Sequence, residues 1–247
     1  MGQKYYHFLL IAKDAIGYKA LKELSSTAWY NIYIDRGMER VPTLKSELTE
    51  IVNKYKGHLI ATTACLGGEL STLALRLIEA EMVYDVATAR NYKQEIVNFL
   101  NYCLDLFGED FYIECAPSLS IEQAQVNKKL VAIAKSCNVK MVVGVDAHYL
   151  QKEDRYIHKA YLNSKNGDRE VDSFYEYAYL MNYDECLEIL SKTLNNDIEL
   201  AQQIMQNTLE IQNKIEDYSI QRKQMIPKIQ LPEYSEWDIY EYIKHID

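Results

Sequence analysis

A carboxylate and an imidazole follow directly after a short apolar run, and these two side chains could take part in chemistry. Residues 141–145 read Met-Val-Val-Gly-Val, and Asp146 and His148 come after them. A run of this kind predicts a strand buried on both faces, as in a parallel sheet. Residues two apart on an extended chain point to the same side, so both side chains should leave the strand end together. The pair could bind a metal ion, or it could be an ordinary turn with a capping acid and a surface histidine.

Other reactive side chains also fall at the ends of predicted strands. Cys65 follows the apolar run 59–64, and Glu114 lies near the end of a strand predicted for 111–115. A cysteine between a strand end and a helix start is expected to have a lowered thiol pKa, which suits a thiolate ligand or nucleophile. The alternative is a small buried thiol. His7 lies on the first predicted strand, where it could face the same site or be a core histidine.

Helical patterns separate these strands and predict how the side chains are positioned. Alternating strands and helices indicate a parallel α/β sheet or barrel, in which the strand ends lie on one face. Cys65, Glu114 and the Asp146/His148 pair should therefore converge. Residues 32–42 read as irregular, and residues 163–172 read as a loop. The remaining elements are strands at 5–11 and 177–181 and helices at 14–31, 43–54, 70 onward, 84–107, 121–136, 152–162, 184–190 and 197–214.

The composition limits the classes of function. The 247 residues carry a formal net charge of -9, which argues against a broad grip on nucleic-acid phosphates. No apolar run is long enough to cross a membrane, and the first residues lack the apolar core of a signal peptide. The five cysteines are odd in number and well separated, which indicates reduced thiols and predicts a cytoplasmic protein.

Four stretches of the chain carry a family resemblance. They include Ala-Cys-Leu-Gly-Gly-Glu and Asp-Ala-His-Tyr, and they lie at residues 6–18, 64–69, 108–127 and 146–158. With these stretches in this order, the sequence resembles the PHP (polymerase and histidinol phosphatase) domain of the bacterial replicative DNA polymerase III alpha subunit. The resemblance implies an α/β fold, here a partial distorted (β/α) barrel of PHP type with parallel strands, surrounding helices and a helical C-terminal segment. It further implies a PHP-like domain at 1–225 that lacks its first strands, and an extended linker with a short helix at 226–247 that leads toward an absent polymerase region.

The same resemblance implies a metal site. By position, His7, Cys65, Asp146 and His148 match the family's metal ligands, whereas Glu114 and His158 match residues to which no ligand role is assigned. The family opens with a His-x-His strand that nothing before residue 5 supplies, so the site should hold at most one divalent ion. Zinc is the expected ion because thiolate and imidazole suit it, with manganese or magnesium as alternatives. The chain could also bind none.

Three functions stay open on the sequence. The first is the PHP portion of a DNA polymerase III alpha subunit in DNA replication, as structural support or as a vestigial metal-dependent 3′–5′ exonuclease or phosphoesterase. The alternatives are a non-catalytic protein-interaction module and a stand-alone metal-dependent phosphoesterase. Whether the chain is an enzyme is open, because it lacks a polymerase palm. The expected partners are other replicase subunits or the remainder of the polymerase chain, with DNA reached only through the full polymerase and no membrane. Self-association through an exposed edge strand at 5–11 is also expected.

Overall fold

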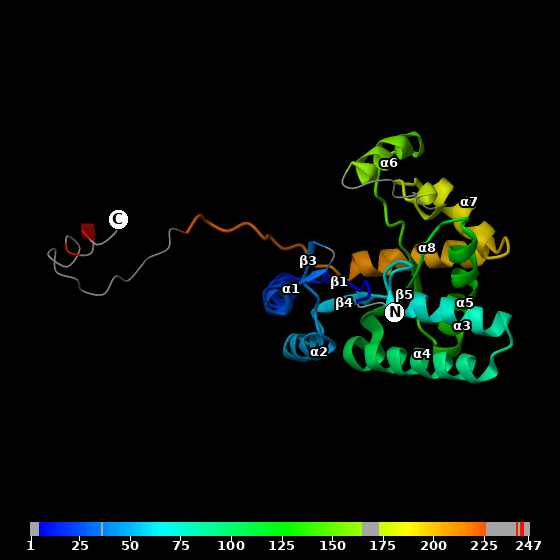
Figure 1. The fold of residues 1–247 in the computed structure, drawn as a ribbon, viewed down its shortest axis with the longest axis horizontal. Helices are drawn as coiled ribbons and strands as arrows, with labels where there is room; N and C mark the ends of the chain where they lie inside the picture. The colour runs from blue at the N-terminus through cyan, green and yellow to red at the C-terminus, as the bar shows by residue number, and fades with distance from the viewer. Residues whose placement is uncertain (1–4, 36, 165–172, 226–240, 242, 245–247) are drawn as a thin grey trace.

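Four strands form the sheet that positions the reactive side chains (Figure 1). The computed structural model describes residues 5–35, 37–164, 173–225, 241 and 243–244. The sheet order is β1-β4-β5-β6, with β4, β5 and β6 parallel and β1 antiparallel to β4. Within the described ranges this sheet is open, so the α/β class is confirmed and barrel closure is not. The strands are β1 (Leu9–Ala12), β4 (Leu59–Thr62), β5 (Phe111–Cys115) and β6 (Met141–Val143).

The connection from β1 to β4 explains why the sheet is not wholly parallel. It contains two helices, α1 (Ala15–Ala28) and α2 (Lys45–Lys54), so the chain returns to the end at which β1 finishes. The Lys13 amide accordingly donates to the His58 carbonyl at 3.0 Å, which joins the end of β1 to the start of β4. The expectation that all strands are parallel is therefore wrong for β1.

A second small sheet occupies the segment expected to be irregular. The strands β2 (Tyr33–Asp35) and β3 (Met38–Arg40) pair as an antiparallel hairpin, and Gly37 takes a φ of 75° in its turn. A short 3-10 helix, η1 (Trp29–Asn31), precedes them. The sequence pattern hid this hairpin because its strands are short and largely exposed, so they lack the alternation of a half-buried strand.

One face of the main sheet packs against three helices. Alternate strand residues such as Ala61, Ile113 and Met141 belong to the large hydrophobic core on that face. The helices are α3 (Glu69–Met82), α4 (Val86–Phe107), which ends in the 3-10 turn η2 (Gly108–Asp110), and α5 (Ile121–Cys137). These bounds lie close to the predicted ones, because apolar residues at helical spacing identify helices of this length well.

The other face of the sheet is covered by the last long helix. Ile60, Tyr112 and Val142 point to this side, where they pack with Ile211 of α8 (Ile198–Asn213) in a separate small core. The helix α7 (Tyr183–Thr193) packs against both α5 and α8. The sheet therefore lies between α8 and the α3, α4 and α5 layer (Figure 1).

The segment between β6 and α7 holds short elements. They are η3 (Lys152–Asp154), α6 (Arg155–Asn163) and η4 (Ser173–Tyr177). In place of the short strand predicted at 177–181, Tyr179 forms an isolated parallel bridge with Tyr149. Most of the predicted loop at 163–172 and nearly all of the predicted linker at 226–247 lie outside the described residues. Among the helices that are described, none is long and apolar enough to cross a membrane.

Candidate functional site at the strand ends

A cleft of about 510 Å³ lies at the carboxyl ends of the parallel strands. Its polar lining includes His7, Cys65, Glu114 and Asp146. Cys65 follows β4, Glu114 lies near the end of β5 and Asp146 follows β6, so these three lie where the parallel topology predicts that they should meet. The opposite wall is formed by Thr208 and Ile211 of α8, while no lysine or arginine of the described chain lines the cleft.

His7 reaches this cleft through its backbone. Its amide donates to the Gly67 carbonyl at 2.9 Å, and the residue forms a parallel bridge with Gly68 just beyond the end of β4. This pairing brings the imidazole Nδ1 to 3.3 Å from the Cys65 Sγ. A side chain at position 67 would begin 3.0 Å from the same Nδ1, so the glycine leaves room for the ring. The sequence left the orientation of His7 open, and the structure directs the ring to Cys65.

The environment of Cys65 holds the proton on its thiol. Burial is the main cause that raises its pKa to about 11, and the carboxylates of Asp146 and Glu114 add to the rise. The hydrogen bond from the Gly67 backbone opposes this change without reversing it. The prediction of a lowered thiol pKa is therefore wrong, since burial and two nearby acids outweigh the positive end of the following helix. A bound cation would reverse this balance, because it favours the thiolate.

Glu114 is the partly buried acid of the cleft. Burial raises its pKa, the hydrogen bond that Thr62 donates at 2.6 Å lowers it in part, and the charge of Asp146 raises it further. The carboxylate lies flat against Gly144, where an added Cβ would come within 2.1 Å of its Oε1. The glycine inside the apolar run 141–145 is the sequence signal for this close approach.

Two residues beside the cleft have unusual backbone conformations. Ala64 has a φ of 57° and Asp146 a φ of 50°, a region in which residues other than glycine are uncommon. Such conformations cost free energy, and they cluster at functional sites where the surrounding structure imposes them. Ala64 directly precedes Cys65, and Asp146 is itself a polar group of the cleft, which indicates that the chain is bent here to place Cys65 and Asp146.

The fourth predicted ligand, His148, lies outside the cleft lining. Its amide donates to the Ala178 carbonyl at 2.7 Å, and its ring Nδ1 lies 2.6 Å from the Asp146 carbonyl oxygen. The ring packs 5.6 Å from the buried His158 ring and 5.2 Å from the Tyr175 ring, measured between centroids. In this conformation His148 fixes the turn after Asp146 and belongs to an aromatic cluster.

The side chains in the cleft are of the types that bind a metal ion, but their positions do not yet match those of a coordination site. Imidazole, thiol and carboxylate groups are the ligands that zinc takes in proteins. In the described part of the chain, no three His, Cys, Asp or Glu side chains already stand in an arrangement that could hold a metal ion. Binding would therefore need side-chain rotation. The exposed Asp146 and His148 have the room for it.

Comparison with known proteins identifies the family to which the N-terminal half of the chain is similar. Residues 1–118 match the family model of the PHP domain. The chain carries a PHP domain. Over 98% of its length it is 44% identical to "Probable DNA polymerase YorL" of Bacillus subtilis (strain 168), of which it covers 19%.

The relatives of this PHP domain include replicative polymerase subunits. It is 36% identical to the DNA polymerase III subunit alpha of Aquifex aeolicus over 62% of the chain and 11% of that protein. It is 29% identical to the corresponding subunit of Borreliella burgdorferi over 100% of the chain and 19% of that protein. The chain thus spans at most 19% of the length of these relatives. The domain is thus similar to the PHP domain of DNA polymerase III alpha subunits.

Proposed function

We propose that this PHP domain serves a DNA polymerase III alpha-like replicase and that its cleft binds one divalent cation, zinc in the first place. The observation that carries the proposal is the grouping of His7, Cys65, Glu114 and Asp146 in one cleft without a lysine or arginine in its described lining. Besides burial, the charge of Asp146 raises the pKa values of Cys65 and Glu114, and a bound cation would relieve this repulsion. We extend the proposal to residues 1–225 as the domain and 226–247 as a linker.

His7, Cys65 and Asp146 are the proposed protein ligands of the ion. His7 and Cys65 already touch, and Asp146 acts electrostatically on the thiol. His148 would join as a fourth ligand only by leaving its ring contacts with His158 and Tyr175. Glu114 accepts a hydrogen bond from Thr62 and packs against the backbone of Gly144. We assign it no ligand role.

The role of the site would be vestigial or structural. A bound zinc ion supplies a Lewis acid for a phosphate oxygen. Hydrolysis of a phosphodiester usually engages two metal ions, which clamp the attacking and leaving oxygens. With three or four protein ligands, this cleft has donors for one ion only. We therefore expect weak or absent 3′–5′ exonuclease activity, and a domain that supports the polymerase and contacts the other replicase subunits.

Metal content tests this proposal. The purified chain is dialysed against zinc in excess and then against metal-free buffer, and its zinc is counted by plasma mass spectrometry. We expect one ion per wild-type chain and none in Cys65→Ser or His7→Ala. The matched control is Cys137→Ser, which removes another partly exposed thiol far from the cleft and should leave the count at one. A zinc-free wild type, or full occupancy in Cys65→Ser, would remove the basis of the proposal.

A further inference from the structure

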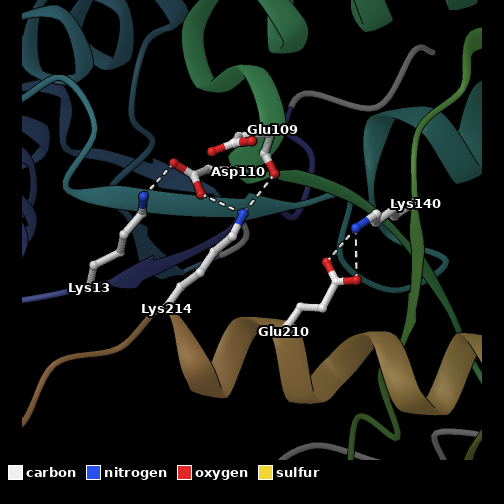
Figure 2. A network of polar contacts seen from close by, with 6 residues as sticks. All are labelled: Lys13, Glu109, Asp110, Lys140, Glu210 and Lys214. Atoms are coloured by element: carbon white, nitrogen blue, oxygen red, sulfur yellow. Dashed lines mark hydrogen bonds and ion pairs between the residues drawn. The ribbon is translucent and has the colours of Figure 1, made fainter.

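Figure 2 shows a buried carboxylate, Asp110, with two lysine partners. The cluster lies at the start of β5, whereas the cleft lies at the carboxyl ends of the parallel strands. Asp110 precedes β5, and its Oδ2 lies 2.5 Å from the Lys13 Nζ, which follows β1. Its Oδ1 accepts from the Lys214 Nζ at 2.9 Å, and the same ammonium donates to the Glu109 carbonyl at 2.9 Å. The cluster therefore joins the sheet to Lys214, the residue that caps the end of α8.

Among the described residues, two groups of ion pairs hold α8 to the rest of the domain, and this cluster is the stronger of them. The Asp110 side chain is 9% exposed, and Lys214 is 26% exposed, so solvent screens the pair poorly. The second anchor joins Lys140 to Glu210, and it is 60% and 37% exposed, a class of ion pair that contributes little. Of these two ion pairs, the one with Asp110 therefore contributes more to the position of the C-terminal end of α8.

The residues of α8 that line the cleft lie on the same side of the helix as Lys214. Thr208, Ile211 and Lys214 are spaced three apart, which places them on one side of the helix. Ile211 packs on Ile60, Tyr112 and Val142, and both Thr208 and Ile211 line the cleft. A shift of Lys214 would therefore move the wall that faces Cys65 and Asp146.

The chain that follows α8 is tied to the same cluster. The Glu216 amide donates to the Lys13 carbonyl at 2.8 Å, and the Tyr218 ring lies 6.4 Å from the Tyr18 ring of α1. Beyond these contacts the described chain extends away from the domain, with Met225 84% exposed (Figure 1). A binding partner that pulls on this segment would therefore displace Lys214 before it displaces the residues of α8.

We infer that the Lys13–Asp110–Lys214 cluster is a latch that couples the segment after α8 to the width of the strand-end cleft. With the latch closed, α8 lies on the sheet and the cleft is narrow. When a partner displaces residues 215–218, Lys214 leaves Asp110, α8 moves away from the strand ends and the cleft opens. The inference concerns the geometry of the cleft, so it does not depend on whether the cleft binds a metal.

The test measures how fast a small uncharged alkylating reagent modifies the Cys65 thiol in the full chain with chelator present. Peptide mass spectrometry separates this rate from that of Cys137, which is also partly exposed but lies in α5 on the other side of the sheet. In Lys214→Met we expect the Cys65 rate to rise roughly tenfold, the change that loss of one charged hydrogen bond permits, while the Cys137 rate stays constant. Lys214→Arg keeps the charge and should react like the wild type.

A matched variant and a second latch variant make the test decisive. Lys129→Met removes a lysine of similar exposure, 24%, from its ion pair with Glu81, away from α8, and should leave the Cys65 rate unchanged. Lys13→Met removes the other lysine of the cluster and should raise the modification rate of Cys65. An unchanged Cys65 rate in both latch variants would overturn the inference, and so would a parallel rise of the Cys137 rate, which would report general loosening.

Discussion

Gly144 lies so close to the Glu114 side chain that no larger residue fits at its position. An added Cβ would lie 2.1 Å from Glu114 Oε1 and 2.7 Å from its Cγ. We predict that Gly144→Ala lowers the free energy of unfolding by about 1–3 kcal/mol, the usual cost of overpacking. Urea unfolding measures the change. In a Glu114→Ala background the same substitution should cost much less, and equal costs in both backgrounds would show that the contact with Glu114 is unimportant.

Glu114 should give the domain a distinctive dependence of stability on pH. Its pKa in the folded state is raised, chiefly by burial, so the folded chain holds this proton more tightly than the unfolded chain does. Its contribution to stability is therefore complete below the unfolded pKa and is lost as the pH rises through the folded pKa. At pH 7 we predict that Glu114→Gln unfolds at higher urea concentration than the wild type, by about 1 kcal/mol. The difference should shrink as the pH falls below about 4, where the acid becomes protonated in both states. A constant difference across this range would contradict the assignment.

At the scale of residues, the sequence predicts which groups meet but not how each one points. Cys65, Glu114 and Asp146 could be predicted to converge, because the ends of parallel strands share one edge of the sheet. The orientation of His148 depends on Tyr175, which comes from a distant segment and carries no signal near the Asp-x-His motif. The high pKa of the Cys65 thiol likewise depends on burial in the assembled cleft.

The start of α1 is held by one aspartate that serves two elements. Asp14 accepts from the Gly17 amide at 2.8 Å as the N-cap, and its other oxygen lies 2.6 Å from the His58 Nδ1 just before β4. Burial raises the pKa of Asp14, but the hydrogen bonds from Gly17 and His58 lower it overall. We predict that Asp14→Ala destabilises the domain by about 1 kcal/mol at neutral pH.

The loss in Asp14→Ala should diminish on acidification. A depressed carboxyl pKa contributes stability above the unfolded value, and this contribution disappears as the pH falls through the folded value. Chemical denaturation at neutral and acidic pH measures both limits. The exposed N-cap Asp85 offers the comparison, because Asp85→Ala removes a cap without a histidine partner. If the two variants lose the same stability, the link to His58 contributes nothing.

At the scale of elements, length decides what the sequence can predict. The strand at 111–115 and the helices α4, α5 and α8 lie within a few residues of their predicted bounds, because their apolar periodicity is long or strict. The hairpin of β2 and β3 and the direction of β1 could not be predicted. The hairpin strands have three residues each, too few for a clear pattern, and the direction of β1 follows from how the two helices between β1 and β4 return the chain.

Strand β1 forms one edge of the described sheet, and we expect the domain to associate through that edge. In the described sheet β1 pairs only with β4, and Leu9 on it is 44% exposed. Such edges add strands from other chains. We predict concentration-dependent dimers in light scattering, and a shift to monomer in Leu9→Lys. Leu119→Lys alters a leucine of similar exposure, 39%, away from this edge, and should leave the dimer intact. A wild-type monomer at all concentrations would exclude this association.

The cobalt absorption spectrum of the purified chain tests the central claim most directly. Co²⁺ accepts the same nitrogen, oxygen and sulfur ligands as zinc, and a cobalt–thiolate bond gives an intense charge-transfer band. With His7 beside the Cys65 thiol and Asp146 acting on it, we predict that one equivalent of Co²⁺ produces this band in the wild type. The band should persist in Cys137→Ser and vanish in Cys65→Ser. A wild-type spectrum identical to that of aqueous cobalt, or a band that survives in Cys65→Ser, would contradict the assignment of this cleft as a metal site.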